Sequence, residues 1–448
     1  MTERLPDPLP ESSNGDLDAI SQVAWEQSRA KLLDCLAESI SSAKGWPMVT
    51  VTALRETTKE VTIDVVTNGG FADGETQTYS YRTTADGALE YRPDNVHYDY
   101  FRAIEAYMKD IADEWHGRAS PGRDGQDWTS LSEHNPETFQ YKAFIRQLPR
   151  IKIYCVDLYH ELWNLKVKSW NAIHQELKNQ TSSFLDHVAD ADYVFKSDED
   201  PKRLTTESAH TDTSIMVEYL RKAVTFAFAS TRDDELWNAL DKVLILKTAK
   251  KILRLCRYVA RPLRACLMLQ TIAKRLPKDK TFKLVPRVPP PSVRLGVTVP
   301  SIDQAWERLR LPRPAQWAKE NLMNKYGKIF REECRRPLSI HTELQLLAAY
   351  LQDPSLQPTF NYFGCSKKAC LLCQTTLDLS SLGIRMRGTH GKCYSNWGVP
   401  AASIARMAPT LEALEKVLLQ RIRASLQPGS RYFEHVEADS TLLSEMTE

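Results

Sequence analysis

Residues 339–373 read SIHTELQLLAAYLQDPSLQPTFNYFGCSKKACLLC, and this stretch carries the most informative pattern in the chain. Its first part predicts a helix. Ser339 is a suitable N-cap, so His341 and Glu343 should lie in the first turn. Apolar residues then recur at the spacing that gives a helix one buried face, at Leu344, Leu347 and Leu351.

The second part of the stretch ends in two cysteines. The aromatic run from Phe360 to Gly364 predicts a short buried strand. Cys370 and Cys373 follow, three residues apart, and this spacing places both on one face of a second helix, near its start. A helix N-terminus favours the thiolate, which is the form of cysteine that binds metals.

These residue types are those of a catalytic zinc site. One His and two Cys provide three ligands and leave the fourth position of the metal open for water. Zinc lowers the pKa of such a water to about 7. A carboxylate two residues after the His, as at Glu343, can carry protons without binding the metal. His-x-Glu followed by Cys-x-x-Cys is the arrangement found in zinc-dependent nucleobase deaminases. The sequence therefore predicts that His341, Cys370 and Cys373 bind zinc and that Glu343 is catalytic.

With these motifs, residues of about 285–425 resemble the cytidine deaminase-like superfamily. More narrowly, they resemble the OTT-type predicted nucleic acid deaminases that are abundant in fungi. The resemblance continues through Arg387 to Lys392 and ends at Tyr394 and Trp397. It departs from the usual pattern at Thr342, where many members have Ala, and at Ala369, where the signature has Pro. Neither position is a ligand, so the predicted metal site is kept.

The resemblance implies both a fold and a reaction. The fold is a mixed sheet between layers of helices, with the two metal motifs on adjacent helix starts. The reaction is hydrolytic deamination, in which a metal-activated water attacks C4 of cytosine or C6 of adenine while Glu343 moves the protons. The substrate would be a base in nucleic acid or in a nucleotide.

Two local alternatives and one functional alternative compete with this interpretation. Cys365 lies five residues before Cys370 and could fill the fourth metal position, which would make the site structural. Glu343 could be a first-turn carboxylate that the helix dipole alone stabilises. The chain could also be a non-catalytic, zinc-stabilised interaction protein with a deaminase fold. The intact Glu343 favours an enzyme, because a degenerate domain needs no carboxylate at that position.

The segment after Ile384 provides the candidate substrate contacts. Its alternation predicts a strand, followed by a tight loop in which Gly388 and Gly391 flank His390. Each candidate also has a structural alternative: a loop role for the residues near His390, and a place in the core for Trp397. The predicted substrate contacts are His390, Lys392, Arg387 and Trp397.

The rest of the chain predicts an α+β protein. Residues 1–16 should be disordered, and residues 17–280 mostly helical with a β-meander at about 47–92. The proline run near 286–291 marks a boundary, after which residues 285–425 form the α/β/α zinc domain with its mixed sheet. Residues 427–448 should be an acidic disordered tail. The helical region is expected to cover the active site, bind a protein partner or present the substrate.

Composition and charge restrict the class of protein further. The 448 residues are 42% hydrophobic and 26% charged, which is typical of a soluble globular protein. No membrane span or secretory signal is visible, so an intracellular location, cytoplasmic or nuclear, is expected. The net charge of +2 divides into −6 for residues 1–279, +12 for 280–425 and −4 for the remainder. The basic segment favours a nucleic acid or nucleotide substrate, unless the acidic half docks on it.

Overall fold

The computed structural model describes residues 14–42, 48–70, 81–83, 89–91, 95–117, 139–177, 213–244, 246–287, 301–310 and 320–425. The predicted acidic tail lies outside these residues, as does nearly all of the segment predicted to be disordered at the N-terminus. The exception is its last three residues, which belong to the first helix, α1 (Asn14–Ile40).

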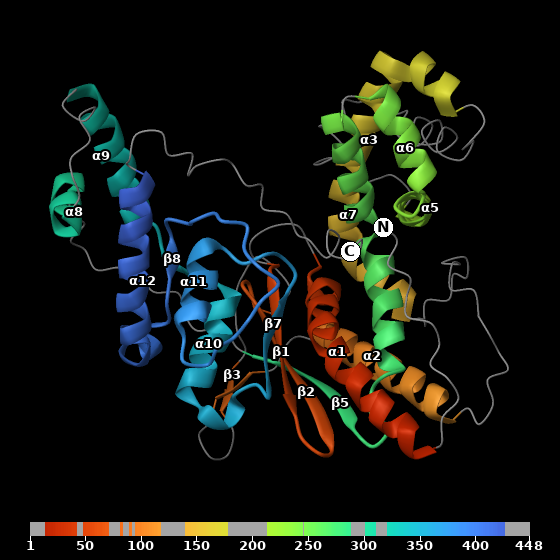
Figure 1. The fold of residues 1–448 in the computed structure, drawn as a ribbon, viewed down its shortest axis with the longest axis horizontal. Coiled ribbons are helices and arrows are strands. Elements are labelled where there is room, and N and C mark those ends of the chain that lie inside the picture. Colours follow the sequence, from red (N-terminus) through yellow and green to blue (C-terminus); the bar gives the residue numbers. More distant parts are fainter. Residues whose placement is uncertain are drawn as a thin grey trace.

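A four-stranded mixed sheet lies at the centre of the fold (Figure 1). The strand order is β5 (Thr281–Pro286), β2 (Glu60–Thr67), β1 (Thr50–Glu56) and β7 (Phe360–Cys365). β1 runs antiparallel to both β2 and β7, whereas β2 and β5 are parallel. An isolated parallel bridge between Tyr362 and Arg385 extends the β7 edge. The expectation of a mixed sheet is thus confirmed.

One strand pairing connects the two regions into which the sequence divides the chain. The sequence predicts a β-meander at about 47–92 within the helical N-terminal region, whereas β1 of this segment pairs directly with β7. The rest of that meander is a separate pair, β3 (Tyr81–Thr83) with β4 (Leu89–Tyr91). The physical reason is burial: seven of the eight residues of β2 are buried, so both faces of the hairpin need a covering layer.

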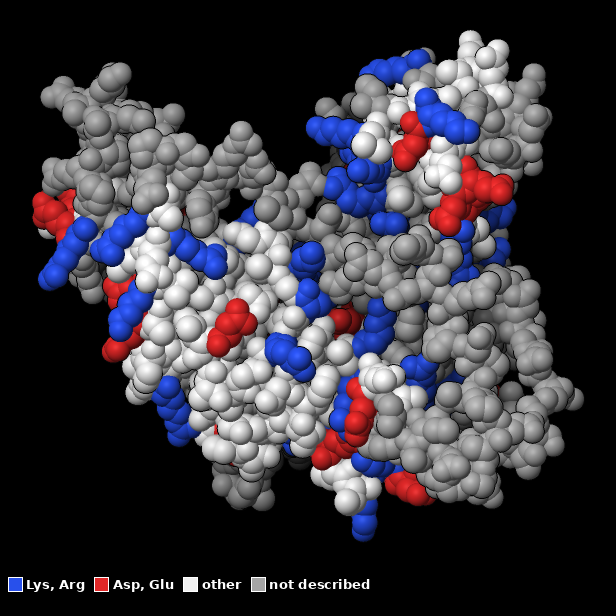
Figure 2. All heavy atoms as spheres, in the orientation of Figure 1, with Lys and Arg blue, Asp and Glu red and all other residues white. Residues whose placement is uncertain are grey.

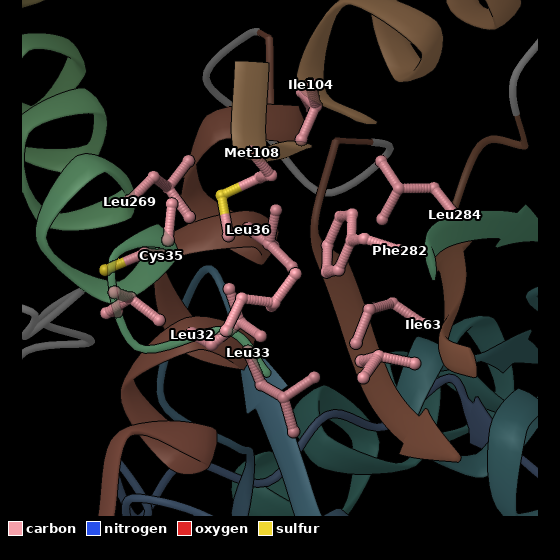
Figure 3. Packing of buried hydrophobic residues seen from close by; sticks show 14 of the residues in the cluster. Leu32, Leu33, Cys35, Leu36, Ile63, Ile104, Met108, Leu269, Phe282 and Leu284 are labelled. Atoms are coloured by element: carbon pink, nitrogen blue, oxygen red, sulfur yellow. The ribbon is translucent and has the colours of Figure 1, made fainter. Parts of the chain in front are cut away.

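Helices from the N-terminal half cover one face of the sheet. They are α1, α2 (Asn95–Gly117) and α7 (Leu246–Ala273). Figure 3 shows Leu32 and Leu36 of α1 meeting Met108 of α2 and Leu269 of α7, with Phe282 of β5 closing the cluster. These side chains belong to one buried apolar core, which anchors α1 on the sheet.

Helices from the C-terminal part cover the opposite face. They are α10 (Thr342–Gln352) and α11 (Leu371–Leu379), which lie on the other side of the sheet from α1 in Figure 1. Leu344 and Leu347 of α10 pack in one core with Val51 of β1 and Phe363 of β7. The short parallel pair of β6 (Ser339–Ile340) and β8 (Trp397–Gly398) precedes α10 and α12 (Ile404–Ser425).

A buried carboxylate joins three strands of the sheet to α10. Asp64 of β2 is fully buried and accepts hydrogen bonds from Arg55 of β1 at 2.8 and 3.0 Å. Arg287, just after β5, donates to it at 2.9 Å, and the hydroxyl of Tyr350 in α10 donates at 2.9 Å. A buried acid is tolerated when it is paired in this way. Asp64 therefore links segments that lie nearly 300 residues apart.

The remaining described helices lie beyond this sandwich. α3 (Phe139–Leu177), α5 (Thr213–Ser230) and α6 (Asp234–Val243) pack with α7 around a second apolar core and rise above α1 in Figure 1. α8 (Ile302–Leu309) and α9 (Glu320–Arg335) precede β6, and two short 3-10 turns, Pro354–Leu356 and Ala401–Ser403, follow α10 and β8. None of the helices in the described part of the chain is both apolar enough and long enough to cross a membrane.

Candidate metal centre

His341 occupies the N-cap position of α10. Its backbone is extended, at φ −67° and ψ 149°, and its carbonyl accepts hydrogen bonds from Leu344 and Gln345 at 2.9 and 3.0 Å. The imidazole makes no capping bond, so the ring is available to other groups. Ser339, the predicted N-cap, instead lies in β6. Because Ser339 pairs with Trp397, the backbone stays in the extended conformation through Ile340. The helix therefore begins two residues later than expected.

Cys370 occupies the equivalent position at the start of α11. Its Sγ accepts the backbone N–H of Cys373 at 3.3 Å, which satisfies one of the free donors in the first turn. Ala369, which replaces the usual proline, accepts hydrogen bonds from His390 N–H at 3.0 Å and from the Thr389 hydroxyl at 2.9 Å. These bonds hold the entry to α11 without the proline.

The three predicted ligands converge. Nδ1 of His341 lies 3.5 Å from Sγ of Cys370 and 3.4 Å from Sγ of Cys373. The ligand atoms all lie within 4.8 Å of one another, and all three residues are buried. Among the described residues, this is the group of His, Cys, Asp and Glu side chains that could hold a metal ion. Two sulfurs and one imidazole nitrogen fit zinc well.

The electrostatics of the cluster favour a negative charge on one of the two sulfurs. A hydrogen bond from the Cys373 thiol, helped by His341, lowers the pKa of Cys370 to about 5. Burial and the neighbouring Cys370 raise the pKa of Cys373, so the two sulfurs share one proton. Burial acts to lower the pKa of His341, but the hydrogen bond with Cys370 and the nearby charge of Glu343 outweigh it and raise that pKa.

Cys365 is separate from this group. It is fully buried in β7, where its N–H donates to Asp34 of α1 at 3.1 Å. Burial raises the pKa of its thiol, which opposes thiolate formation. Within the described residues, the candidate ligand group comprises His341, Cys370 and Cys373 without Cys365. The geometry therefore does not favour the closed, four-ligand alternative.

Glu343 lies in the first turn of α10 beside the ligands. Only 3% of the residue is exposed. Burial raises the pKa of its carboxyl group, whereas the charge of His341 and a hydrogen bond with Cys373 lower it. The hydroxyl of Thr342 donates to its Oε2 at 3.4 Å. A carboxylate held only by the helix dipole would face solvent, so this placement favours a role at the cluster.

Trp397 contacts one of the candidate ligands directly. Its indole Nε1–H donates to Sγ of Cys373 at 3.3 Å. The sequence suggested base stacking or core packing for this residue. The strand pair β6–β8 brings the indole to the cluster, and the spacing of residues in the chain gives no sign of that contact.

The loop after Gly388 closes one side of the site. Leu371 N–H donates to the carbonyl of Lys392 at 2.9 Å, which ties the loop to the start of α11. His390 is buried, and this burial lowers the pKa of its imidazole. The ring of Tyr394 lies edge-on to two imidazoles. Its centroid is 5.5 Å from the ring centroid of His341 and 5.9 Å from that of His390. Tyr394, for which the sequence suggested no role, is 40% exposed and lies against both imidazole rings.

The four predicted substrate contacts thus have different surroundings. His390 lies beside the start of α11, the Lys392 side chain is exposed, and Trp397 bonds to Cys373. The guanidinium nitrogens of Arg387 are buried, and its charge acts on Asp34 and Glu38 of α1. Arg387 therefore faces the α1 side of β7.

Comparison with known proteins agrees with the geometry of this segment. Residues 340–401 match the family model of the OTT_1508-like deaminases. The match begins at Ile340 in β6, contains the three candidate ligands and Glu343, and ends just after β8. This part of the chain is thus similar to a deaminase domain. No curated protein and no solved structure matched the chain.

Proposed function

We propose that this protein is a zinc-dependent hydrolytic deaminase that acts on a cytosine or adenine base. One observation carries the proposal: His341, Cys370 and Cys373 converge in a buried cluster with Glu343 beside them, inside the segment that matches a deaminase family model. A structural zinc site needs four protein ligands and no adjacent acid. Three ligands and one carboxylate are the groups that a hydrolytic zinc site uses.

The roles of the residues follow from their positions. Zinc, held by Nδ1 of His341 and the two Sγ atoms, would supply water with its pKa lowered to about 7. Glu343 accepts a proton from that water and delivers it to the ring nitrogen of the base. It would then take the second proton from the hydroxyl newly added to the ring carbon and pass it to the departing amine, so that a C–N bond is replaced by a C–O bond and ammonia leaves. The N–H of Trp397 holds Cys373 in its ligating orientation.

Substrate binding would use the rim of the site. Tyr394 offers an exposed aromatic face for a base, and Lys392 an exposed cation for a phosphate group. The basic balance of residues 280–425 supports a nucleic acid or nucleotide. On the face shown in Figure 2, however, lysines and arginines are interspersed with acids, and a largely uncharged stretch covers the region of α10 and α11. Both a free nucleotide and a polynucleotide therefore remain candidate substrate classes.

The first test is the metal content of the purified, reduced protein. Wild type and Glu343→Ala should each hold one zinc per chain, and Cys370→Ala should lose it, since Glu343 is not a ligand. Release of ammonia from cytosine or adenine substrates should occur only with wild type. A wild-type protein without zinc would overturn the proposed mechanism. Zinc in both proteins with no deamination by wild type would instead support the non-catalytic interaction protein.

A further inference from the structure

The N-terminal half contains a basic segment that its overall charge conceals. Residues 1–279 carry a net charge of −6, but residues 139–273 within them contain 21 Lys and Arg against 16 Asp and Glu, a net charge of +5. The helices α3, α5, α6 and α7 carry 16 of these cations and only 7 of the acids. The positive charge therefore belongs to the helices that surround the second apolar core.

The helix α7 contributes the largest share of this charge. It contains seven Lys and Arg residues and no Asp or Glu. Four of the cations follow one another at a spacing of three or four residues, so they share one side of the helix. The buried Ile252 and Val259 lie on the other side. We call the four cations the α7 basic face: Lys247 and Lys250, which are exposed, and Arg254 and Arg257, which are half-buried.

The nearby acids do not cancel the positive charge. Lys251, beside the face, pairs with Glu161 of α3 at 2.5 Å, and Arg261 pairs with Glu38 of α1 at 3.4 Å. The net charge of +5 already counts every acid of residues 139–273, including those of the acidic connection between α3 and α5. Glu38 lowers the excess by one. A surplus of positive charge therefore remains whichever of these groups pair with one another.

Cations also crowd one another beside the face. Burial, together with the charges of Arg257 and Arg232, lowers the pKa of Arg264 to about 10. Arg232 lies in the turn between α5 and α6, so this crowding extends from α7 to a neighbouring element. In Figure 2, lysines and arginines gather on the part of the surface that α3 and α7 form. Like charges at such short range repel one another, and a bound polyanion would relieve the repulsion.

We propose that the α7 basic face binds the phosphate backbone of a nucleic acid strand. Lys247 and Arg257 are ten residues apart, which is about 15 Å along a helix. One strand presents a phosphate about every 3.4 Å along the axis of a duplex, so the face matches about four phosphates. The guanidinium forks of Arg254 and Arg257 suit phosphate oxygens. A row of cations with about one charge per helical turn fits a regular polyanion better than it fits a single phosphate group.

The inner end of the face leads towards the metal motif. Arg261 lies one turn beyond Arg257, and its charge acts on Lys367, which precedes Cys370 by three residues. A strand held on α7 would therefore continue towards the metal cluster. The helical half would then present a base within a polynucleotide, rather than as a free nucleotide. This last step rests on the proposed function, whereas binding to α7 does not.

The test is the fluorescence anisotropy of a labelled single-stranded oligonucleotide that is titrated with the full-length, zinc-loaded protein. Lys247→Gln/Lys250→Gln should weaken binding at least about tenfold at 0.1 M salt, and should reduce the slope of log K against log salt by about 1.4, since each phosphate contact on a single strand contributes about 0.7. The matched control, Lys59→Gln/Lys109→Gln, removes the same charge from exposed residues of the β1–β2 turn and α2. It should bind like wild type.

A second variant separates charge from folding. Lys247→Arg/Lys250→Arg keeps both charges and should bind like wild type, and all variants should melt at the wild-type temperature because the replaced side chains are exposed. A wild-type protein that binds no oligonucleotide would overturn the proposal, and would indicate that acidic segments of the chain cover the face. Wild-type affinity and salt slope in Lys247→Gln/Lys250→Gln would overturn it as well.

Competition identifies the class of partner. Polyglutamate with the same total charge should displace the oligonucleotide only weakly, and equal competition would overturn the assignment in favour of an acidic protein. The assay measures binding without turnover. A wild-type protein that binds the oligonucleotide through α7 but deaminates no base would therefore count against the proposed function and leave the α7 site in place.

Discussion

The Sγ atom of Cys373 has two kinds of neighbour. On one side it faces the other predicted ligands, with Nδ1 of His341 at 3.4 Å. On the other it accepts the indole N–H of Trp397 at 3.3 Å. A hydrogen bond to a ligating sulfur orients it and stabilises its negative charge, and loss of such a bond weakens metal binding. Trp397 is therefore a positioning residue for Cys373.

Replacement of Trp397 by Phe tests this role, because the ring remains and the N–H is lost. We expect zinc affinity to fall by about tenfold, measured by competition with a chromophoric chelator. Trp237→Phe is the matched control, since it removes an indole N–H that donates to the carbonyl of Ser230 at 2.6 Å in the other helical core. Equal zinc affinity in Trp397→Phe and wild type would contradict the positioning role.

The convergence of the candidate ligands could be predicted from the sequence because each motif is local. His-x-Glu and Cys-x-x-Cys define faces of single helix turns, and the structure places all four residues in one buried group. Tyr394, Trp397 and Arg387 could not be assigned in this way. Their surroundings depend on the β6–β8 pairing and on the packing of α1 against β7, which join segments far apart in the chain.

At the scale of elements, the contact between α1 and β7 depends on one glycine. A Cβ atom at Gly364 would lie 2.2 Å from the carbonyl carbon and 2.5 Å from the oxygen of Leu33. These are backbone atoms, so no rotamer change can relieve the clash. The helix also bonds to the sheet at this point, where the hydroxyl of Thr52 donates to the same Leu33 oxygen at 2.8 Å. Gly364 thus permits close packing of helix on strand.

Gly364→Ala should lower the free energy of unfolding by about 3 kcal/mol, the upper range for overpacking of a tight contact. Urea unfolding followed by circular dichroism measures the change. Gly327→Ala in α9 is the control, because its Cβ would meet only Ile302 Cγ2, at an ordinary 3.8 Å. That substitution should raise stability by about 0.5–1 kcal/mol through helix propensity. A Gly364→Ala protein as stable as wild type would show that α1 is free to move away from β7.

At the scale of the whole molecule, the sandwich is built from segments that the sequence predicts to lie in two separate regions. The β-meander predicted at about 47–92 contains both β1 and β2. Their partner could not be predicted, because nothing local distinguishes an isolated hairpin from the middle of a larger sheet. Residues from α2 to α7 separate β2 from β5, and this long insertion concealed the pairing.

This assembly predicts that residues 285–425 alone do not form the zinc domain. Without β1, β2 and most of β5, β7 loses its antiparallel partner, and the core under α10 loses Val51, Ala53 and Val66. We expect the 285–425 fragment to show no cooperative unfolding transition and to bind less than one zinc per chain, measured by circular dichroism and metal analysis.

Coexpression supplies the control for this prediction. Fragments 1–287 and 288–448 together contain every strand of the sheet, so they should copurify as a complex that holds one zinc, because the β1–β7 pairing and the core it closes need no covalent link between them. A 285–425 fragment that unfolds cooperatively and binds stoichiometric zinc would contradict the prediction. It would mean that α10, α11 and α12 close the metal cluster themselves, and that the hairpin from residues 50–67 only adds an edge to a finished fold.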